Sequence, residues 1–323
     1  MIVRWGIAEL GPTLSELGFS RPYVLASPRF AELPLEPCGR WSELPTDRIE
    51  AVSTDATAVD ADVVVALGGG STIDTGKAVS AETGLPLVSI PTTYSGAEWT
   101  DFYGIRDPDR RMRGGGAGAN LSAIVYEPKL SLDLPRAETV GTSLNALAHC
   151  AEALYVIQRN QAADRHAVAG AKLIGEWLPR VVTGEGDRLE ARTELLRGAS
   201  EGGAALGGSM LGLGHAMAQA LGGRYGVPHG AMNALCLPPA LRFNVEAVPA
   251  EVARFGEALG ADDPAARVEE LARLGGFERL RDFGVQEGDL GDVAEAVVTR
   301  AGAKANPRPA TASEVAGLLR SIW

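Results

Sequence analysis

Three of the chain's four histidines stand where their side chains could form one chemical site. His215 and His229 lie fourteen residues apart in GLGHAMAQALGGRYGVPHG, and His149 lies upstream in SLNALAHCAEALY. Imidazole can act as a general acid or base near neutral pH, and it is a common metal ligand. One such histidine alone is more often a core residue, but three together favour a site of convergent imidazoles. His166, in RNQAADRHAVAG, has the surroundings of an ordinary surface position on a helix.

The residues around His215 and His229 predict a defined local geometry. His215 opens an apolar run of small residues, which is typical of a buried helix. Gly222 and Gly223 are expected to end that helix, because glycine tolerates the left-handed conformation that closes helices. Pro228 restricts the backbone just before His229. These features would hold the two imidazoles in fixed positions.

The composition is that of a globular protein with two domains. The chain has 323 residues, of which 46% are hydrophobic and 22% charged, and its formal net charge is −11. An acidic surface argues against nucleic acid as a partner, since a phosphate backbone requires a basic face. The three cysteines lack CxxC spacing, which indicates reduced thiols in a cytoplasmic protein. We expect no signal peptide and no membrane span, and the partner expected is a small-molecule substrate.

The first part of the chain predicts a parallel α/β sheet. Val63–Leu67 is a continuous apolar run led by three valines, as in a strand buried on both faces. The turn Gly68–Gly70 follows, with Ser71 as the expected N-cap of a helix over Thr72–Thr83. A second apolar strand, Leu85–Ile90, comes next. Strand, helix and strand of these lengths indicate βαβ units.

The glycine turn is a candidate dinucleotide-binding site. Gly69, Gly70 and Ser71 would let a phosphate approach the backbone at the start of the helix, where the helix dipole favours an anion. The triplet is not the G-x-G-x-x-G fingerprint, and a plain tight turn is the alternative interpretation. Four further candidates for cofactor contacts lie near the same predicted sheet edge: Ser27, Asp74, Thr92 and Thr93.

A charged and then glycine-rich segment over residues 101–120 precedes the last clear strand, Leu121–Tyr126. It is expected to form a β-hairpin or a mobile flap. Arg110, Arg111 and Arg113 within it are candidate ligands for a substrate carboxylate, since guanidinium pairs with carboxylate in a fork geometry. A solvated run of charges is the alternative.

From Arg136 onward the sequence predicts helices to the end, and we place the domain boundary near Leu134. The expected domains are an α/β dinucleotide-binding domain over residues 1–134 and an all-helical domain over 135–323. Asn145 and His149 are four residues apart and therefore share one face of a helix.

Six sequence blocks resemble the iron-containing, or group III, alcohol dehydrogenase family, and within it the maleylacetate reductase branch. They are ALGGGSTIDTGKA (66–78), PTTYSGAEWT (91–100), IVYEPKLSLDLP (124–135), SLNALAHCAEALY (143–155), GHAMAQALGGRYGVPHG (214–230) and NPRP (306–309). The resemblance implies a Rossmann-like dinucleotide-binding domain followed by an all-helical domain, the architecture of dehydroquinate synthase-like proteins. It also implies hydride transfer from NADH or NADPH, and we expect a homodimer.

The resemblance implies a set of metal ligands as well. In metal-dependent members an aspartate and three histidines bind iron or zinc, and these positions fall on Asn145, His149, His215 and His229. Asn145 replaces the aspartate, as is usual in the maleylacetate reductase branch. A dication then loses its only anionic ligand, so we expect the metal to be weakly held or absent. Gln219 stands where the family usually has another histidine near the substrate, and its amide cannot titrate.

These observations predict a cytoplasmic NAD(P)H-dependent reductase that acts on a carbonyl of a small, anionic substrate. The resemblance points to the conversion of maleylacetate to 3-oxoadipate, a step of aromatic compound catabolism. The three imidazoles would polarise the carbonyl oxygen, directly or through a metal, and Gln219 would orient the substrate or a water. The alternatives are a metal-dependent alcohol dehydrogenase of another substrate, a lyase or cyclase on the same scaffold, and a non-catalytic paralogue.

The segment after the strand Pro22–Ala26 bears on the choice of cofactor. NAD-specific folds place a carboxylate there, which holds the ribose 2′-hydroxyl and repels a 2′-phosphate. Here Ser27, Pro28 and Arg29 follow instead, so NADPH and NADH are both expected to bind.

Overall fold

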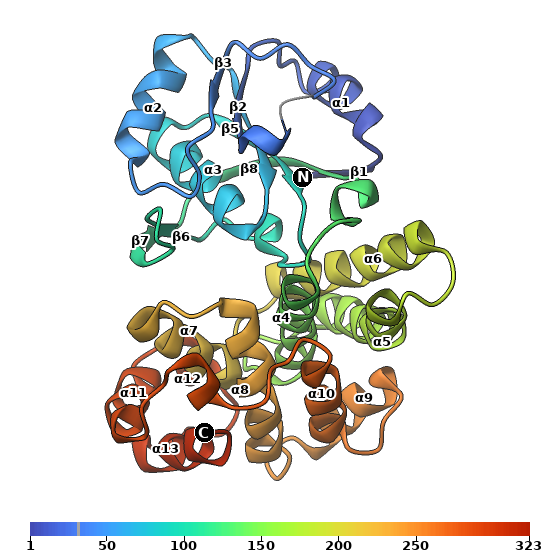
Figure 1. The fold of residues 1–323 in the computed structure, drawn as a ribbon, viewed down its shortest axis with the longest axis vertical. Coiled ribbons are helices and arrows are strands. Elements are labelled where there is room, and N and C mark those ends of the chain that lie inside the picture. Colours follow the sequence, from blue (N-terminus) through green and yellow to red (C-terminus); the bar gives the residue numbers. More distant parts are fainter. Residues whose placement is uncertain (31–32) are drawn as a thin grey trace. The chain divides into compact units, whose positions relative to one another are not determined.

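The computed structural model describes residues 1–30 and 33–323 (Figure 1). The chain forms two compact units, one of residues 1–93 and 97–133 and the other of residues 94–96 and 134–323. The second unit thus takes in three residues, Tyr94–Gly96, from the middle of the first unit's sequence. The domains expected from the sequence, residues 1–134 and 135–323, assign Tyr94–Gly96 to the first domain instead.

The first unit is built on a six-stranded parallel sheet with the strand order β1-β8-β5-β4-β2-β3. Its strands are β1 (Ile2–Trp5), β2 (Pro22–Ala26), β3 (Gly39–Trp41), β4 (Val63–Gly68), β5 (Pro86–Pro91) and β8 (Asn120–Tyr126). β4 lies in the interior of the sheet and all its residues are buried, as its run of valines predicts. The predicted parallel α/β architecture is confirmed.

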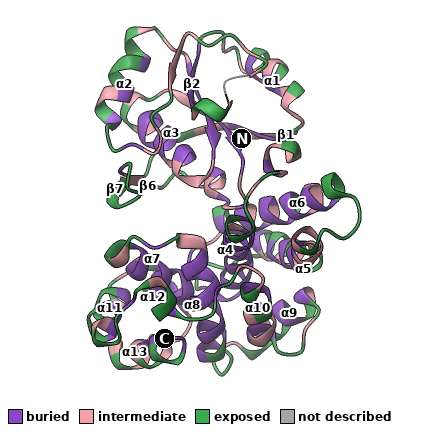
Figure 2. Ribbon diagram, viewed as in Figure 1, coloured by how far each residue is buried: buried purple, intermediate pink, exposed green. Residues whose placement is uncertain are grey.

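Helices cover both faces of this sheet (Figure 2). Alternate residues of β4 face opposite sides, so Val63 and Val65 pack with α1 (Leu10–Glu16), while Val64 and Ala66 pack with α2 (Ile49–Ala58) and α3 (Gly70–Thr83). The segment for which a hairpin or flap was expected is an antiparallel hairpin of β6 (Tyr103–Arg106) and β7 (Met112–Gly116). Every residue of β7 is exposed.

The second unit is helical. Its helices are α4 (Arg136–Tyr155), α5 (Gln161–Thr183), α6 (Arg188–Gly207), α7 (Leu213–Tyr225), α8 (His229–Asn244), α9 (Pro249–Leu259), α10 (Pro264–Arg273), α11 (Leu290–Val298), α12 (Ala301–Ala305) and α13 (Ala312–Ser321). α4 is buried along almost its whole length and packs against α5, α6 and α8. Among the described residues, no helix has the length and apolarity needed to cross a membrane.

Two predicted helix ends are wrong. α3 begins earlier than expected, with Gly69 as its N-cap, because the amides of Thr72 and Ile73 both donate to the Gly69 carbonyl; Ser71 lies inside the first turn. α7 continues through Gly222 and Gly223 and ends at Gly226, which has a φ of 67°. Glycine lowers helix propensity without forcing an end, and only a left-handed residue closes the helix.

Candidate functional site

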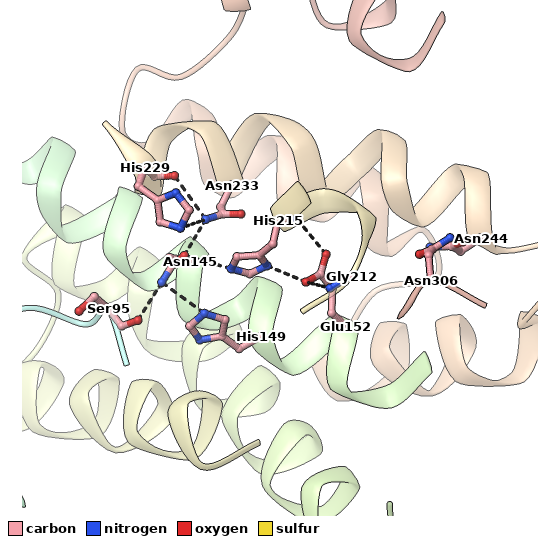
Figure 3. Close-up of polar contacts among 10 residues, drawn as sticks. All are labelled: Ser95, Asn145, His149, Glu152, Gly212, His215, His229, Asn233, Asn244 and Asn306. Carbon is pink, nitrogen blue, oxygen red and sulfur yellow. Dashed lines mark hydrogen bonds and ion pairs between the residues drawn. The ribbon is translucent and has the colours of Figure 1, made fainter. Parts of the chain in front are cut away.

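Three helices of the second unit bring the predicted polar residues together (Figure 3). α4 carries Asn145 and His149, α7 carries His215, and α8 begins with His229. The imidazole rings of His149 and His215 stack with centroids 4.8 Å apart, and those of His215 and His229 lie 5.9 Å apart. The sequence prediction of convergent imidazoles therefore describes one cluster, which we call the imidazole cluster. His166, by contrast, is exposed on α5 and pairs with Glu201.

Asn145 lies at the centre of the imidazole cluster. Its Nδ2 donates to the carbonyl oxygen of Ser95 at 2.8 Å and lies 3.5 Å from Nε2 of His149. A backbone carbonyl can only accept, so this contact fixes which end of the amide is the donor. Asn145 Oδ1 is then left to face Nε2 of His215, at 3.2 Å.

Glu152 is a member of the site that the sequence reading missed. It is fully buried on α4, and its carboxylate accepts from Nδ1 of His215 at 2.6 Å. The same carboxylate accepts from the backbone amides of Gly212 and His215, so it also caps the amino end of α7. Nδ1 of His215 faces the Glu152 carboxylate and Nε2 faces the amide oxygen of Asn145, so these two side chains fix the orientation of the ring. Glu152 lies seven residues after Asn145 and therefore on the same face of α4, and this spacing could have identified it as a member of the site.

Asn233 was also missed. It is fully buried on α8, one helical turn after His229. Its Nδ2 donates to Oδ1 of Asn145 at 2.6 Å and lies 3.0 Å from Nε2 of His229. Asn233 therefore links the third imidazole to the centre of the cluster, and only its four-residue spacing from His229 hinted at this.

His149 is buried within the imidazole cluster. Burial, and then the proximity of His215 and His229, hold its pKa well below the usual value for histidine. Its Nδ1 has no hydrogen-bond partner among the described residues. A Cβ atom at Gly96 would approach that nitrogen to 3.3 Å and the Cα of Gly203 to 3.2 Å, so the backbone seals this side of the ring. His149 is thus suited to act as a neutral imidazole.

These side chains, as they are folded here, do not fit a divalent cation. The Nε2 atoms of His149 and His229 lie at 3.5 and 3.0 Å from amide nitrogens of Asn145 and Asn233, so each of these ring nitrogens faces an N–H group, which cannot bind a cation. The donor set is three imidazoles and an amide, without a carboxylate. No group of three or more His, Cys, Asp or Glu side chains with metal-binding geometry occurs among residues 1–30 and 33–323.

The other predicted substrate residues are divided between the two units. Gln219 lies one turn after His215 on α7, half-buried, and within the described part of the chain its side chain makes no hydrogen bond. Arg110 and Arg111 are exposed on the connection between β6 and β7 of the first unit. Arg113 forms an ion pair with Asp107 at 2.5 Å.

The predicted cofactor residues gather at one edge of the sheet in the first unit. Ala26 pairs with Leu67 and Gly68 pairs with Pro91, so the residues after these strands, Ser27, Gly69 and Thr92, follow neighbouring strand ends. This is the edge at which parallel α/β sheets bind ligands.

The start of α3 fits a pyrophosphate group. A Cβ at Gly69 would meet Cγ2 of Thr93 at 3.1 Å, so glycine keeps the turn open and close to Thr93. Thr92 Oγ1 is buried without a partner among the residues described. Asp74 is engaged instead by Lys77 at 2.8 Å and by the amide of Gly104, so its predicted contact with cofactor has to compete with these bonds.

A parallel sheet with a glycine turn at its ligand-binding edge, together with a helical unit that buries a cluster of imidazoles, defines the class. These are features of NAD(P)-dependent oxidoreductases, in which the sheet binds the dinucleotide and polar side chains stabilise charge on the substrate.

The comparisons with known proteins agree. The model of iron-containing alcohol dehydrogenases matches residues 39–125, and that of the C-terminal part of the Fe-containing alcohol dehydrogenase family matches residues 139–323. The chain is 32% identical over 330 residues to the maleylacetate reductase of Pseudomonas sp. (strain P51), covering 98% of this chain and 93% of that protein. The chain therefore belongs to the iron-containing alcohol dehydrogenase family, and it is an NAD(P)-dependent oxidoreductase.

Solved structures show the same fold. The crystal structure of maleylacetate reductase from Agrobacterium tumefaciens matches with a TM-score of 0.89 at 30% identity, covering 100% of this chain and 95% of that one. A sulfoacetaldehyde reductase from Bifidobacterium kashiwanohense, solved in complex with NAD+, shares the fold with a TM-score of 0.86 at 20% identity, covering 100% and 96%. Iron-containing alcohol dehydrogenases use NAD(P)H and a divalent metal.

Proposed function

We propose that this chain is a maleylacetate reductase, which converts maleylacetate to 3-oxoadipate with NADH or NADPH. The observation that carries the proposal is the 32% identity to a maleylacetate reductase over nearly the whole of both chains. The imidazole cluster supports it, because it gathers imidazole and amide groups, which are able to hydrogen-bond an oxygen that gains negative charge.

The conversion of maleylacetate to 3-oxoadipate reduces a carbon–carbon double bond and leaves the ketone unchanged. Hydride adds to the alkene carbon β to the ketone, the π electrons move to the ketone oxygen as an enolate, and a proton from water or an acid group then goes to the α carbon. In this proposed reaction the carbonyl is the electron acceptor and not the bond that is reduced, so the proposal differs from the carbonyl reduction expected from the sequence. The cluster would stabilise the enolate oxygen by hydrogen bonding.

The test is oxidation of NADH and of NADPH by the purified chain, followed by the loss of their absorbance. Maleylacetate is compared with a panel of keto acids and aldehydes, with and without added iron or zinc and with chelator. We expect turnover of maleylacetate with either cofactor and without added metal. Turnover that is restricted to alcohols or aldehydes and requires metal would support a metal-dependent alcohol dehydrogenase instead, and no turnover at all would support a non-catalytic paralogue.

Gln219 is proposed to bind substrate without donating a proton. Its side chain has no other partner in the described chain, and an amide cannot titrate. Gln219→Ala should raise KM by about 3- to 30-fold with little change in kcat, and Gln219→His should add an ionisation near pH ~6.5 to the pH–rate profile. If Gln219→Ala abolishes turnover and leaves KM unchanged, the residue takes part in the chemistry and this role is wrong. A homodimer, a cytoplasmic location and substrate binding by Arg110, Arg111 or Arg113 stay predictions.

A further inference from the structure

Arg300 lies between α11 and α12, both of which pack against α7. α12 approaches α7 closely, since a Cβ at Gly302 would come within 2.5 Å of the carbonyl oxygen of Gly212. α7 is the helix that carries His215 and Gln219. The start of α12 is therefore anchored to the helix that supplies part of the imidazole cluster.

The guanidinium of Arg300 is half-buried and lacks a counter-ion. Burial lowers its pKa, and its Nε is buried without a hydrogen-bond partner among the described residues. No carboxylate in residues 1–30 or 33–323 forms an ion pair with it. Arg192, which is buried more deeply, donates to Thr139 Oγ1 at 2.9 Å and to Tyr94 Oη at 3.2 Å. Withdrawing an unpaired cation from water costs free energy unless an anion compensates for it.

The guanidinium of Arg300 lies beside α7, the helix that carries His215 of the imidazole cluster. Arg300 Nη2 lies 3.9 Å from the place a Cβ of Gly223 would take. His215, Gln219 and Gly223 follow one another at four-residue steps, so they form a column along α7 that spans about 12 Å. Gly223 is exposed and places no side chain against Arg300 Nη2. The column thus joins hydrogen-bonding groups at one end to a cation at the other.

We propose that Arg300 binds a carboxylate of the substrate, remote from the carbon that accepts hydride, and so selects dicarboxylates over neutral carbonyl compounds. This inference rests on the proposed function, because it requires an anionic substrate. A guanidinium can hold a carboxylate through two parallel hydrogen bonds, and the terminal nitrogens of Arg300 have no hydrogen-bond partner among the described residues. Arg113, expected from the sequence to do this, is already neutralised by Asp107.

The first experiment is steady-state reduction of maleylacetate by the wild-type enzyme and by Arg300→Met, Arg300→Lys and Arg224→Met. Arg224 is the matched control, because it lies next to Gly223 on α7 but is exposed and paired with Asp289 and Asp292. We expect Arg300→Met to raise KM about 10- to 100-fold with kcat within about 3-fold, Arg300→Lys to fall between, and Arg224→Met to match the wild type. An unchanged KM in Arg300→Met overturns the proposal.

The second experiment keeps this inference separate from the proposed function. Adipate, a six-carbon dicarboxylate that cannot be reduced, is titrated calorimetrically into the wild-type protein and Arg300→Met in the presence of NAD+. Arg300→Met should bind adipate at least about 10-fold more weakly, while its thermal unfolding stays close to that of the wild type. Equal affinity, or no affinity in either protein, overturns the assignment of Arg300. Loss of the proposed function would appear differently, as wild-type enzyme that binds adipate but does not oxidise NADH with maleylacetate.

Discussion

Asn145 decides the hydrogen-bond pattern of the imidazole cluster. Its amide faces the Ser95 carbonyl and His149 with the nitrogen, and His215 and Asn233 with the oxygen. The resemblance to iron-containing alcohol dehydrogenases implied that an amide stands here in place of a carboxylate. It could not show that the same amide donates to one imidazole and accepts from another, because the two contacts depend on how three helices pack.

Replacing Asn145 by aspartate should increase metal binding. The change supplies an anionic oxygen among three imidazoles and removes the two amide hydrogens that now face Ser95 and His149. After dialysis against zinc, elemental analysis should find at least about 10-fold tighter binding in Asn145→Asp than in the wild type. Asn120→Asp, at an exposed position in β8, is the control for added charge. Equal zinc content of the two Asp variants would show that these imidazoles do not form a latent metal site.

His149 should make the stability of the protein depend on pH. Its folded pKa is lowered, so as pH falls below about 6.5 the unfolded chain takes up a proton that the folded chain does not. The free energy of unfolding should therefore decrease with falling pH, by at most about 1.4 kcal/mol per pH unit from this group. Urea unfolding at pH 7 and pH 5 should show a smaller decrease for His149→Gln than for the wild type. His166→Gln, on the surface of α5, should keep the wild-type decrease; a His149→Gln slope identical to it would contradict the account.

At the scale of elements, the starts of two helices, α7 and α3, position groups of the two candidate sites. Glu152 of α4 caps the start of α7 and bonds His215 in its first turn, so the helix end and the imidazole are set by one carboxylate. At the start of α3 no side chain caps the glycine turn, so the amides of Gly70 and Ser71 can face an anion. The strand and helix that flank this turn were predicted from local patterns, whereas the N-cap was misplaced because Ser71 has the more typical residue type.

Gly70→Val tests the turn before α3. A branched side chain beside the first amides of the helix should keep a pyrophosphate from the backbone and weaken NADH binding by at least about 10-fold in calorimetry. Gly291→Val is the matched control, since Gly291 lies in the first turn of α11 with open space around it. If Gly70→Val binds NADH as tightly as the control does, the pyrophosphate lies elsewhere.

At the scale of the whole molecule, the two units share the chain in an interleaved order. Tyr94–Gly96 belongs to the helical unit although the sheet unit precedes and follows it. Tyr94 is fully buried; its amide donates to Thr142 Oγ1, and its hydroxyl accepts from Arg192. The composition of three residues does not reveal which unit they belong to. The sequence therefore predicted a single boundary, whereas the chain passes from one unit to the other more than once.

Tyr94→Ala should therefore destabilise the helical unit. Removing a fully buried aromatic ring leaves a cavity and should cost about 3–5 kcal/mol, whereas Tyr94→Phe removes only the hydroxyl contact and should cost about 1 kcal/mol. Calorimetric unfolding of the two variants and the wild type gives both values. A loss below about 1 kcal/mol in Tyr94→Ala would show that these residues are not part of the helical core.

The sequence alone determined the features that depend on neighbouring residues. The valine run of β4, the glycine turn and the apolar periodicity of the long helices are local, and together with the sequence blocks they were enough to predict the α/β-then-helical architecture and the family. The tertiary structure decided what the site is made of. Glu152 meets His215 across 63 positions, and Asn145 meets Ser95 across 50 and Asn233 across 88. Such pairs form only when packed helices bring distant segments within hydrogen-bond distance, and burial then makes each contact obligatory because an unpaired polar group in the interior is costly.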